Sequence, residues 1–227
     1  MEGCVGRELA ASLKDCVALM QQTGVERGST WGAYEWVTDP QQFEYHMKDL
    51  WRDMMGTAYV GVEVKCYEGQ VCVVQLASCC RVVLLDALSL PGYATHRHIE
   101  ALLGDVRVVK VCHGHIKNLA WMRSNFSIAL SSPIFDTAEH AQALHGLSPD
   151  GQPSLEALCC HYLNYQLKNT YQNANWRQRP MPTEMLQYAA MEAQVLLPLQ
   201  FALEVAMDKV AMDVRPQSTE SENEFFC

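Results

Sequence analysis

The sequence predicts an α/β fold in which a mixed five-stranded sheet is flanked by helices. Three apolar, strand-like segments at about 58–66, 70–77 and 81–86 follow one another with short turns between them, which favours an antiparallel meander. After residue 86, helical and strand-like patterns alternate, and this implies crossover connections that pair the last two strands in parallel. The chain has 227 residues, 49% of them apolar, so it can bury one substantial core.

Two helices are expected ahead of the first strand. Residues 7–22 predict an amphipathic helix, because they carry apolar side chains at helical spacing, namely Leu9, Leu13, Cys16, Val17 and Met20. A connector that contains Gly, Ser and Thr follows at residues 23–32. Asp39 and Pro40 suit the N-cap and first turn of a second helix. Its core-facing side chains are expected to be Phe43, Met47, Leu50 and Met54.

The later elements follow the same alternation. Strands are expected at 107–112 and around 134–135, and helices near 95–104, 137–146, 154–168 and 182–213. A further helix is expected to follow the strand at 107–112 and to carry Asn118, Leu119, Met122 and Phe126. The segment after Arg215 is polar and acidic up to a Phe pair near its end, so it lacks the apolar content to fold alone. The predicted organisation is an N-terminal helix with its connector at 1–33, a folded domain at 34–213 and a disordered acidic tail at 214–227.

Composition favours an intracellular protein without membrane association. No apolar run is long enough to cross a bilayer, and residues 1–4 lack the pattern of a secretory signal. Most of the ten cysteines lie in strand or helix patterns, which fits buried thiols in a reducing compartment.

The net charge of −9 bears on nucleic-acid binding. Such binding depends on neutralising phosphates, so a binder is expected to carry a clustered basic patch. The basic residues of this chain are scattered, and Arg177 and Arg179 are better placed to tie a loop to core carboxylates than to hold RNA. RNA binding is therefore expected to be weak or indirect.

Four segments resemble the motifs of one enzyme family: residues 59–76, 110–122, 135–137 and 175–192. In the second segment, a strand ends in His-Gly and the next helix carries a Trp. The third segment reads Phe-Asp-Thr. The fourth reads Asn-Trp-Arg-Gln-Arg-Pro, followed later by Tyr-Ala. These motifs resemble the RNase D family of DEDD-type 3′→5′ exonucleases, and in particular its nuclear, exosome-associated branch. The resemblance implies an RNase H-like fold for the predicted sheet.

In that family, an Asp-x-Glu pair on a strand and two further aspartates hold divalent metals, and a tyrosine is the general base. The resemblance puts Tyr188 at the position of the base, and it puts other residues at the four metal positions, namely Glu63, Lys65, Asn118 and Glu192. None of these four keeps the family's residue. Residues two apart on a strand share a face, so the Lys65 ammonium should point with Glu63 into a pocket built for two cations. We expect Lys65 to pair with Glu63 or Glu192, and we expect no catalytic residue, metal or other cofactor.

The resemblance and the altered motif together predict a pseudo-exonuclease. Its expected role is that of a protein-interaction or scaffold subunit of a nuclear RNA-processing or RNA-decay assembly, with an active exonuclease or an exosome subunit as partner. One alternative is an RNA-binding module that keeps the substrate groove. Another is an active 3′→5′ exoribonuclease that uses one metal on Glu63 and Glu192.

Overall fold

The computed structural model describes residues 33–90, 92–128, 133–148 and 151–213. The expected helix at 7–22 and the tail at 214–227 lie outside the described residues, so the predicted boundaries at 33 and 213 stay predictions. The elements are β1 (Glu35–Val37), α2 (Pro40–Thr57), β2 (Tyr59–Tyr67), β3 (Gln70–Ala77), β4 (Val82–Asp86), α3 (Gly92–Gly104), β5 (Val109–Cys112), α4 (His115–Phe126), β6 (Ile134–Asp136), α5 (Thr137–His145), α6 (Leu155–Leu163), α7 (Thr183–Gln194) and α8 (Leu196–Asp213).

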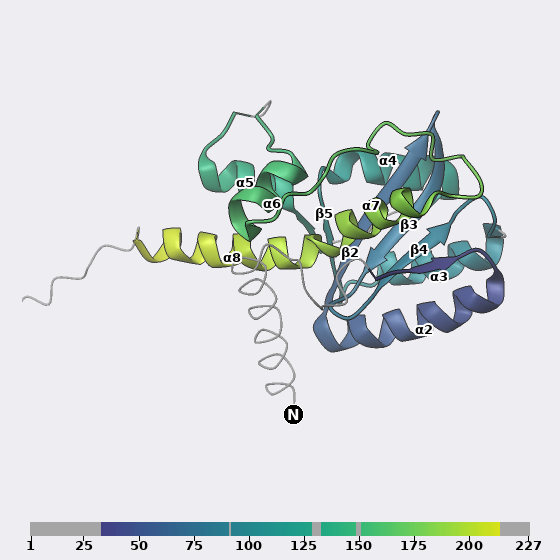
Figure 1. Ribbon diagram of the computed structural model, residues 1–227. Coiled ribbons are helices and arrows are strands. Elements are labelled where there is room, and N and C mark those ends of the chain that lie inside the picture. Colours follow the sequence, from purple (N-terminus) through teal and green to yellow (C-terminus); the bar gives the residue numbers. More distant parts are fainter. Residues whose placement is uncertain (1–32, 91, 129–132, 149–150, 214–227) are drawn as a thin grey trace, which may run out of the picture.

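One mixed sheet organises the molecule, in the order β1-β4-β3-β2-β5-β6 (Figure 1). The predicted meander is confirmed, because β3 pairs antiparallel with both β2 and β4, and β5 and β6 join in parallel as expected. The predicted number of strands is wrong: the sheet has six, since β1 pairs in parallel with β4. A three-residue strand is too short to show a periodic pattern, so only its pairing reveals it.

Helices cover both faces of the sheet. Alternate side chains of β2 point to opposite faces. Val60, Val62 and Val64 pack with α2, α3 and α4 in one core cluster. The residues between them, Gly61, Glu63 and Lys65, point to the other face. There Gly61 lies against Ala193 and Leu196, and Lys65 pairs with Glu192 of α7. Hydrophobic packing thus occupies one face of β2, and polar groups gather on the other.

The hairpin between β2 and β3 has a two-residue turn and a nearby irregularity. Glu68 and Gly69 both have positive φ values, 49° and 78°, as the twist of a tight hairpin favours. The pairing register shifts between Lys65 and Cys66. Such bulges often re-aim a side chain next to a functional site, and this one directly follows Lys65.

Two helix predictions need correction. The helix expected at 154–168 ends at Leu163, because Asn164 adopts a left-handed conformation (φ 51°) that terminates it. The helix expected at 182–213 is two helices, α7 and α8, which meet at Val195. Pro198 lies in the first turn of α8, where its missing N–H costs nothing, whereas inside one long helix it would clash with the carbonyl of Gln194. None of the described helices is long and apolar enough to cross a membrane.

Candidate functional site

The fold brings the five residues singled out in the sequence together. Glu63 and Lys65 come from β2, and Asn118 lies in the first turn of α4. Tyr188 and Glu192 are one turn apart on α7, so their side chains share the helix face that covers the sheet. Four of these side chains are buried and Glu63 is half-buried.

The Lys65 ammonium lies at the centre of this group. It forms an ion pair with Glu192, which confirms one of the two expected partners. Its Nζ is also 4.9 Å from the centre of the Tyr188 ring and 5.4 Å from the centre of the Trp176 ring. An ammonium over aromatic faces gains cation–π attraction. Lys65 is only 7% exposed, so these protein groups replace most of the water around its charge.

Tyr188 also contacts the carboxylate that pairs with Lys65. Its hydroxyl donates to Oε1 of Glu192 at 2.8 Å and lies 3.2 Å from Oδ1 of Asn169. Burial, and next the negative charge of Glu192, raise the pKa of Tyr188 above its ordinary value. The phenol therefore stays protonated at neutral pH and serves as a donor to Glu192.

Glu63 has a different environment. Its Oε2 accepts hydrogen bonds from the side-chain amide of Asn118 (3.1 Å) and the backbone N–H of Val64 (3.3 Å). Burial raises the pKa of Glu63 to about 7, against the opposing effect of Lys65 and with a smaller contribution from Glu192. A carboxyl with this pKa is partly protonated at neutral pH.

These contacts do not fit a pair of divalent cations. Two-metal chemistry requires several oxygen ligands around two ions about 4 Å apart, and Mg²⁺ needs near-ideal octahedral oxygen geometry. Here both carboxylates are already engaged by nitrogen donors, because Glu63 accepts a hydrogen bond from Asn118 and Glu192 forms an ion pair with Lys65. Within the described part of the chain, no three His, Cys, Asp or Glu side chains are arranged to hold a metal ion.

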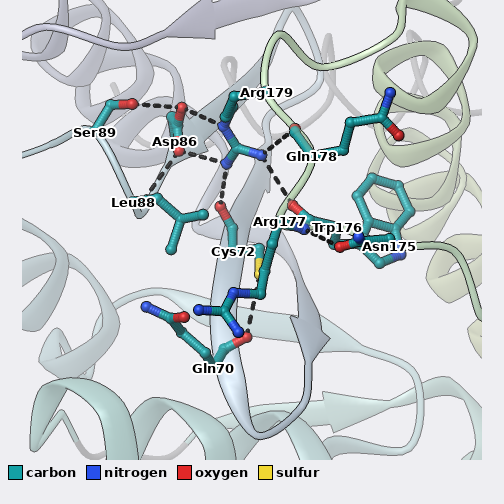
Figure 2. A network of polar contacts seen from close by, with 10 residues as sticks. All are labelled: Gln70, Cys72, Asp86, Leu88, Ser89, Asn175, Trp176, Arg177, Gln178 and Arg179. Atoms are coloured by element: carbon teal, nitrogen blue, oxygen red, sulfur yellow. Dashed lines mark hydrogen bonds and ion pairs between the residues drawn. The ribbon is translucent and has the colours of Figure 1, made fainter.

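A second polar network fixes the loop that covers the site, and Figure 2 shows it. Arg179 donates to both oxygens of Asp86, at 2.5 and 2.8 Å. The same guanidinium donates to the carbonyls of Cys72, Trp176 and Gln178. Burial by itself would raise the pKa of Asp86, but hydrogen bonds from Arg179, Ser89 and the Leu88 N–H hold it below its ordinary value. The prediction that an arginine ties this loop to a core carboxylate is therefore confirmed for Arg179.

Arg177, in contrast, pairs with Glu68, at 3.2 Å on the surface. Both side chains are at least half exposed. The expectation that both arginines hold core carboxylates is therefore wrong for Arg177, because its side chain leaves the loop toward the β2–β3 turn.

Sequence reasoning assigned no role at the site to three residues that lie next to it, although Trp176 belongs to the fourth motif. Trp176 and Asn169 lie in the loop before α7 and contact Lys65 and Tyr188, and loop residues of this kind have no periodicity that predicts their contacts. Gln75 is fully buried on β3 opposite Glu63, and among the described residues its amide has no hydrogen-bond partner. A signal for Gln75 did exist, since an amide in an otherwise apolar strand is unusual.

Three comparisons relate the chain to known proteins. It is 32% identical over 129 residues to Exosome complex component 10 of Homo sapiens, covering 57% of this chain and 14% of that protein. The crystal structure of the catalytic core of RRP6 from Trypanosoma brucei superposes with a TM-score of 0.69 at 22% identity, covering 88% of this chain and 53% of that one. Escherichia coli RNase D, an exoribonuclease, superposes with a TM-score of 0.66 at 18% identity, covering 78% and 46%.

The similarity is confined to one part of the relatives, because the chain spans only 14% to 20% of the length of the first curated relatives it matches. The two structural likenesses support the RNase H-like exonuclease fold that the motifs implied. The family model described as 3'-5' exonuclease matches residues 34–208, which is most of the chain. The chain therefore belongs to the 3'-5' exonuclease family.

Proposed function

We propose that this protein is a pseudo-exonuclease that serves as a protein-interaction subunit of a nuclear RNA-processing assembly. The observation that carries the proposal is the ion pair between Lys65 and Glu192. Lys65 supplies, as part of the protein, a positive charge at the position where the family resemblance implies a carboxylate ligand. A divalent cation placed beside this ammonium would be repelled by it and would compete with it for Glu192.

The remaining groups support the same conclusion. Asn118 carries no charge, and its amide hydrogen faces Glu63 where a metal would need an oxygen. Tyr188 directs its proton to Glu192, so at neutral pH it is a poor general base. The active-enzyme alternative would have to use Glu63 and Glu192, and both are already engaged with other donors.

A role in an assembly is supported by the relatives. One of them is named as a component of the human exosome complex. A fold that has lost its chemistry still offers its surface for association, and the net charge of −9 disfavours RNA as the principal partner. We therefore propose a protein partner, such as an active exonuclease or another subunit of an RNA-processing complex.

The inactivity is tested by incubating purified full-length protein with 5′-labelled single-stranded RNA in Mg²⁺ or in Mn²⁺. We expect no shortening from the 3′ end. The informative control carries the family residues at all four positions, Glu63→Asp, Lys65→Glu, Asn118→Asp and Glu192→Asp, and trimming by it would show that the groove still accepts RNA. Trimming by the natural protein that disappears in Glu63→Ala would overturn the proposal.

The partner is tested by affinity purification from cell extract, with and without ribonuclease treatment, followed by mass spectrometry. Protein partners that survive ribonuclease are expected for an interaction subunit. If all co-purifying proteins disappear after ribonuclease and the purified protein binds RNA tightly by fluorescence anisotropy, the RNA-binding alternative replaces the proposal.

A further inference from the structure

The turn between β3 and β4 carries two adjacent cysteines that the proposed function does not use. Cys79 and Cys80 follow Ser78, just beyond the last paired residues of the two strands. Their Sγ atoms lie 3.3 Å apart. Cys80 is exposed and Cys79 is half-buried, whereas Cys72 and Cys112 are buried within strands. The pair therefore combines close contact between two thiols with access from solvent.

Contacts with α2 hold this turn in place. The Ser78 hydroxyl accepts hydrogen bonds from the backbone N–H groups of Cys80 and Arg81, at 3.2 Å each. The same hydroxyl donates to Oδ2 of Asp53 at 3.0 Å. The Arg81 guanidinium forms ion pairs with Asp53 and Asp49 on the same helix, at 2.6 and 3.2 Å. The backbone on both sides of the cysteine pair is thus attached to α2.

A second adjacent pair, Cys159 and Cys160, has a different geometry. Both residues belong to α6, where consecutive side chains point in directions about 100° apart and do not face each other. Cys159 is buried in a core cluster, and Cys160 is exposed. The contact between the thiols of Cys79 and Cys80 therefore depends on the conformation of the turn, because adjacency in the sequence does not by itself produce it.

The two thiols of the turn differ in their readiness to react. Burial raises the pKa of Cys79 to about 12, with smaller contributions from Cys80 and Asp53. The thiolate is the form of cysteine that attacks an oxidant, so Cys79 is a poor first nucleophile. Cys80 is exposed, and an oxidant in solution therefore meets its sulfur first. This difference assigns the first step of an oxidation to Cys80 and the second to Cys79.

Chelation of a metal ion fits this pair less well than oxidation. A structural zinc ion requires four ligands. The Asp53 carboxylate, which contributes to the electrostatics of Cys79, is already bound by Ser78 and Arg81. In the ranges that the structure describes, no group of three His, Cys, Asp or Glu side chains surrounds a position for a metal ion. Two neighbouring thiols can instead react with each other.

We propose that Cys79 and Cys80 are a peroxide-sensitive modification site that closes reversibly into a disulfide. The Cys80 thiolate attacks one oxygen of hydrogen peroxide and the O–O bond breaks, which leaves a sulfenic acid on Cys80 and a hydroxide that takes up a proton. The Cys79 sulfur then attacks the sulfenic sulfur, and the hydroxyl group leaves as water with the proton of Cys79. In total the two thiols lose two electrons and two protons, and one peroxide is reduced to two water molecules.

Closure of this disulfide must disturb the turn. Adjacent Cα atoms are about 3.8 Å apart across a trans peptide bond, whereas disulfides usually join residues whose Cα atoms are about 4.4–6.8 Å apart. The backbone between the cysteines therefore has to move, and with it the Cys80 N–H that donates to Ser78. A disulfide formed in such geometry is more easily reduced, so glutathione reopens it in a reducing compartment. The modification thus changes reversibly how the turn is attached to α2.

Peptide mass spectrometry on the full-length protein tests this site. The reduced protein is treated with stoichiometric hydrogen peroxide, and the remaining thiols are alkylated with N-ethylmaleimide. We expect the segment with Cys79 and Cys80 to lose the mass of two hydrogens, to escape alkylation at both positions, and to recover both thiols when reduced glutathione is added. Cys159 and Cys160 are the control pair within the same molecule, and they should form no disulfide with each other.

Two variants separate the roles of the two thiols. In Cys79→Ser the sulfenic acid on Cys80 has no partner thiol, so dimedone should label it more strongly than in the natural protein. In Cys80→Ser the peroxide-dependent loss of the thiol of Cys79 should disappear. Hydrogen exchange gives a second readout, because oxidation should speed exchange of the Cys80 and Arg81 amides in the natural protein.

Three results would overturn the proposal. The first is oxidation of Cys80 beyond the sulfenic acid while Cys79 remains a thiol. The second is a disulfide between Cys159 and Cys160 that forms as readily as the one in the turn. The third is a disulfide that joins either turn cysteine to another chain. All three are measured on the natural protein, so the test does not depend on whether the variants fold.

Discussion

Two ion pairs with buried carboxylates lie on the α7 side of the sheet, and they differ in how many hydrogen bonds satisfy their polar groups. Asp86 and Arg179 form a bidentate pair in which the guanidinium also reaches three backbone carbonyls. Lys65 and Glu192 form a single contact between an ammonium and a carboxylate that a tyrosine also contacts. In the Asp86–Arg179 pair, nearly every acceptor has a hydrogen-bond donor. The Lys65–Glu192 pair is instead stabilised mainly by the attraction of opposite charges and by the aromatic rings next to the ammonium.

The difference reflects what each pair holds in place. The planar fork of an arginine fixes direction as well as charge, so Arg179 can anchor the loop that carries Trp176. A lysine is a compact point charge with little directional preference. Lys65 therefore suits a site whose requirement is to neutralise acidic groups that lie close together.

The largest expected effect follows from removing Arg179. In Arg179→Met the buried Asp86 carboxylate keeps its charge without its partner, so the free energy of unfolding should fall by about 3–5 kcal/mol. Urea unfolding followed by circular dichroism measures it. The matched control is Arg177→Met, whose ion pair with Glu68 is exposed and should be worth less than about 1 kcal/mol. Equal losses in the two variants would contradict the assignment of Arg179 as the anchor.

A smaller loss is expected when Lys65 is removed. Lys65→Met leaves Glu63 and Glu192 without the ammonium, but Glu63 has a pKa of about 7 and can take up a proton. We expect the free energy of unfolding to fall by roughly 2–3 kcal/mol, and less when Glu192→Gln is added, because a neutral pair carries no unpaired charge. A double-mutant cycle in urea measures the coupling. Strictly additive losses would mean that the pair contributes no interaction energy.

The free energy of unfolding at acid pH distinguishes Asp86 from carboxylates with an ordinary pKa. The pKa of Asp86 is held below 3.8 in the folded protein, so its contribution is present above 3.8 and is lost as pH falls from there through the lower folded value. In Asp86→Asn this contribution is absent at every pH. The difference in free energy of unfolding between the natural protein and Asp86→Asn should therefore narrow below about pH 4. A difference that stays constant down to pH 2 would refute the depressed pKa.

The smallest expected effect is that of divalent ions. Added Mg²⁺ or Mn²⁺ should leave the Tm of the natural protein unchanged, because an ion stabilises only a state that binds it. The variant with Lys65→Glu and Asn118→Asp restores two carboxylates and should gain Tm as Mg²⁺ is added. Differential scanning fluorimetry measures both. A Mg²⁺-dependent rise in the natural protein would mean that Lys65 does not prevent metal binding.

Much of this molecule could be read from its sequence. The strands of the meander follow from apolar segments separated by turn residues, and Asp39 at the start of α2 caps the backbone N–H groups of Gln41 and Gln42 as its residue type predicts. The resemblance to the exonuclease motifs pointed to all five site residues, and the spacing explains why the two residues on β2 share a face, as do the two on α7.

Other features depend on contacts between segments distant in sequence. Whether Lys65 pairs with Glu63 or with Glu192 was open, and the packing of α7 on β2 decides it by bringing the Glu192 carboxylate to the ammonium. Trp176 and Asn169 lie in the loop before α7 and contact side chains of β2 and α7, and Arg179 joins the Trp176 part of this loop to Asp86 on β4. Local sequence determines which backbone conformation a segment prefers and toward which face of a helix or strand its side chains point. The partner of a buried charge is determined by which groups the folded chain brings within a few ångströms, and at this site tertiary packing alone decided it.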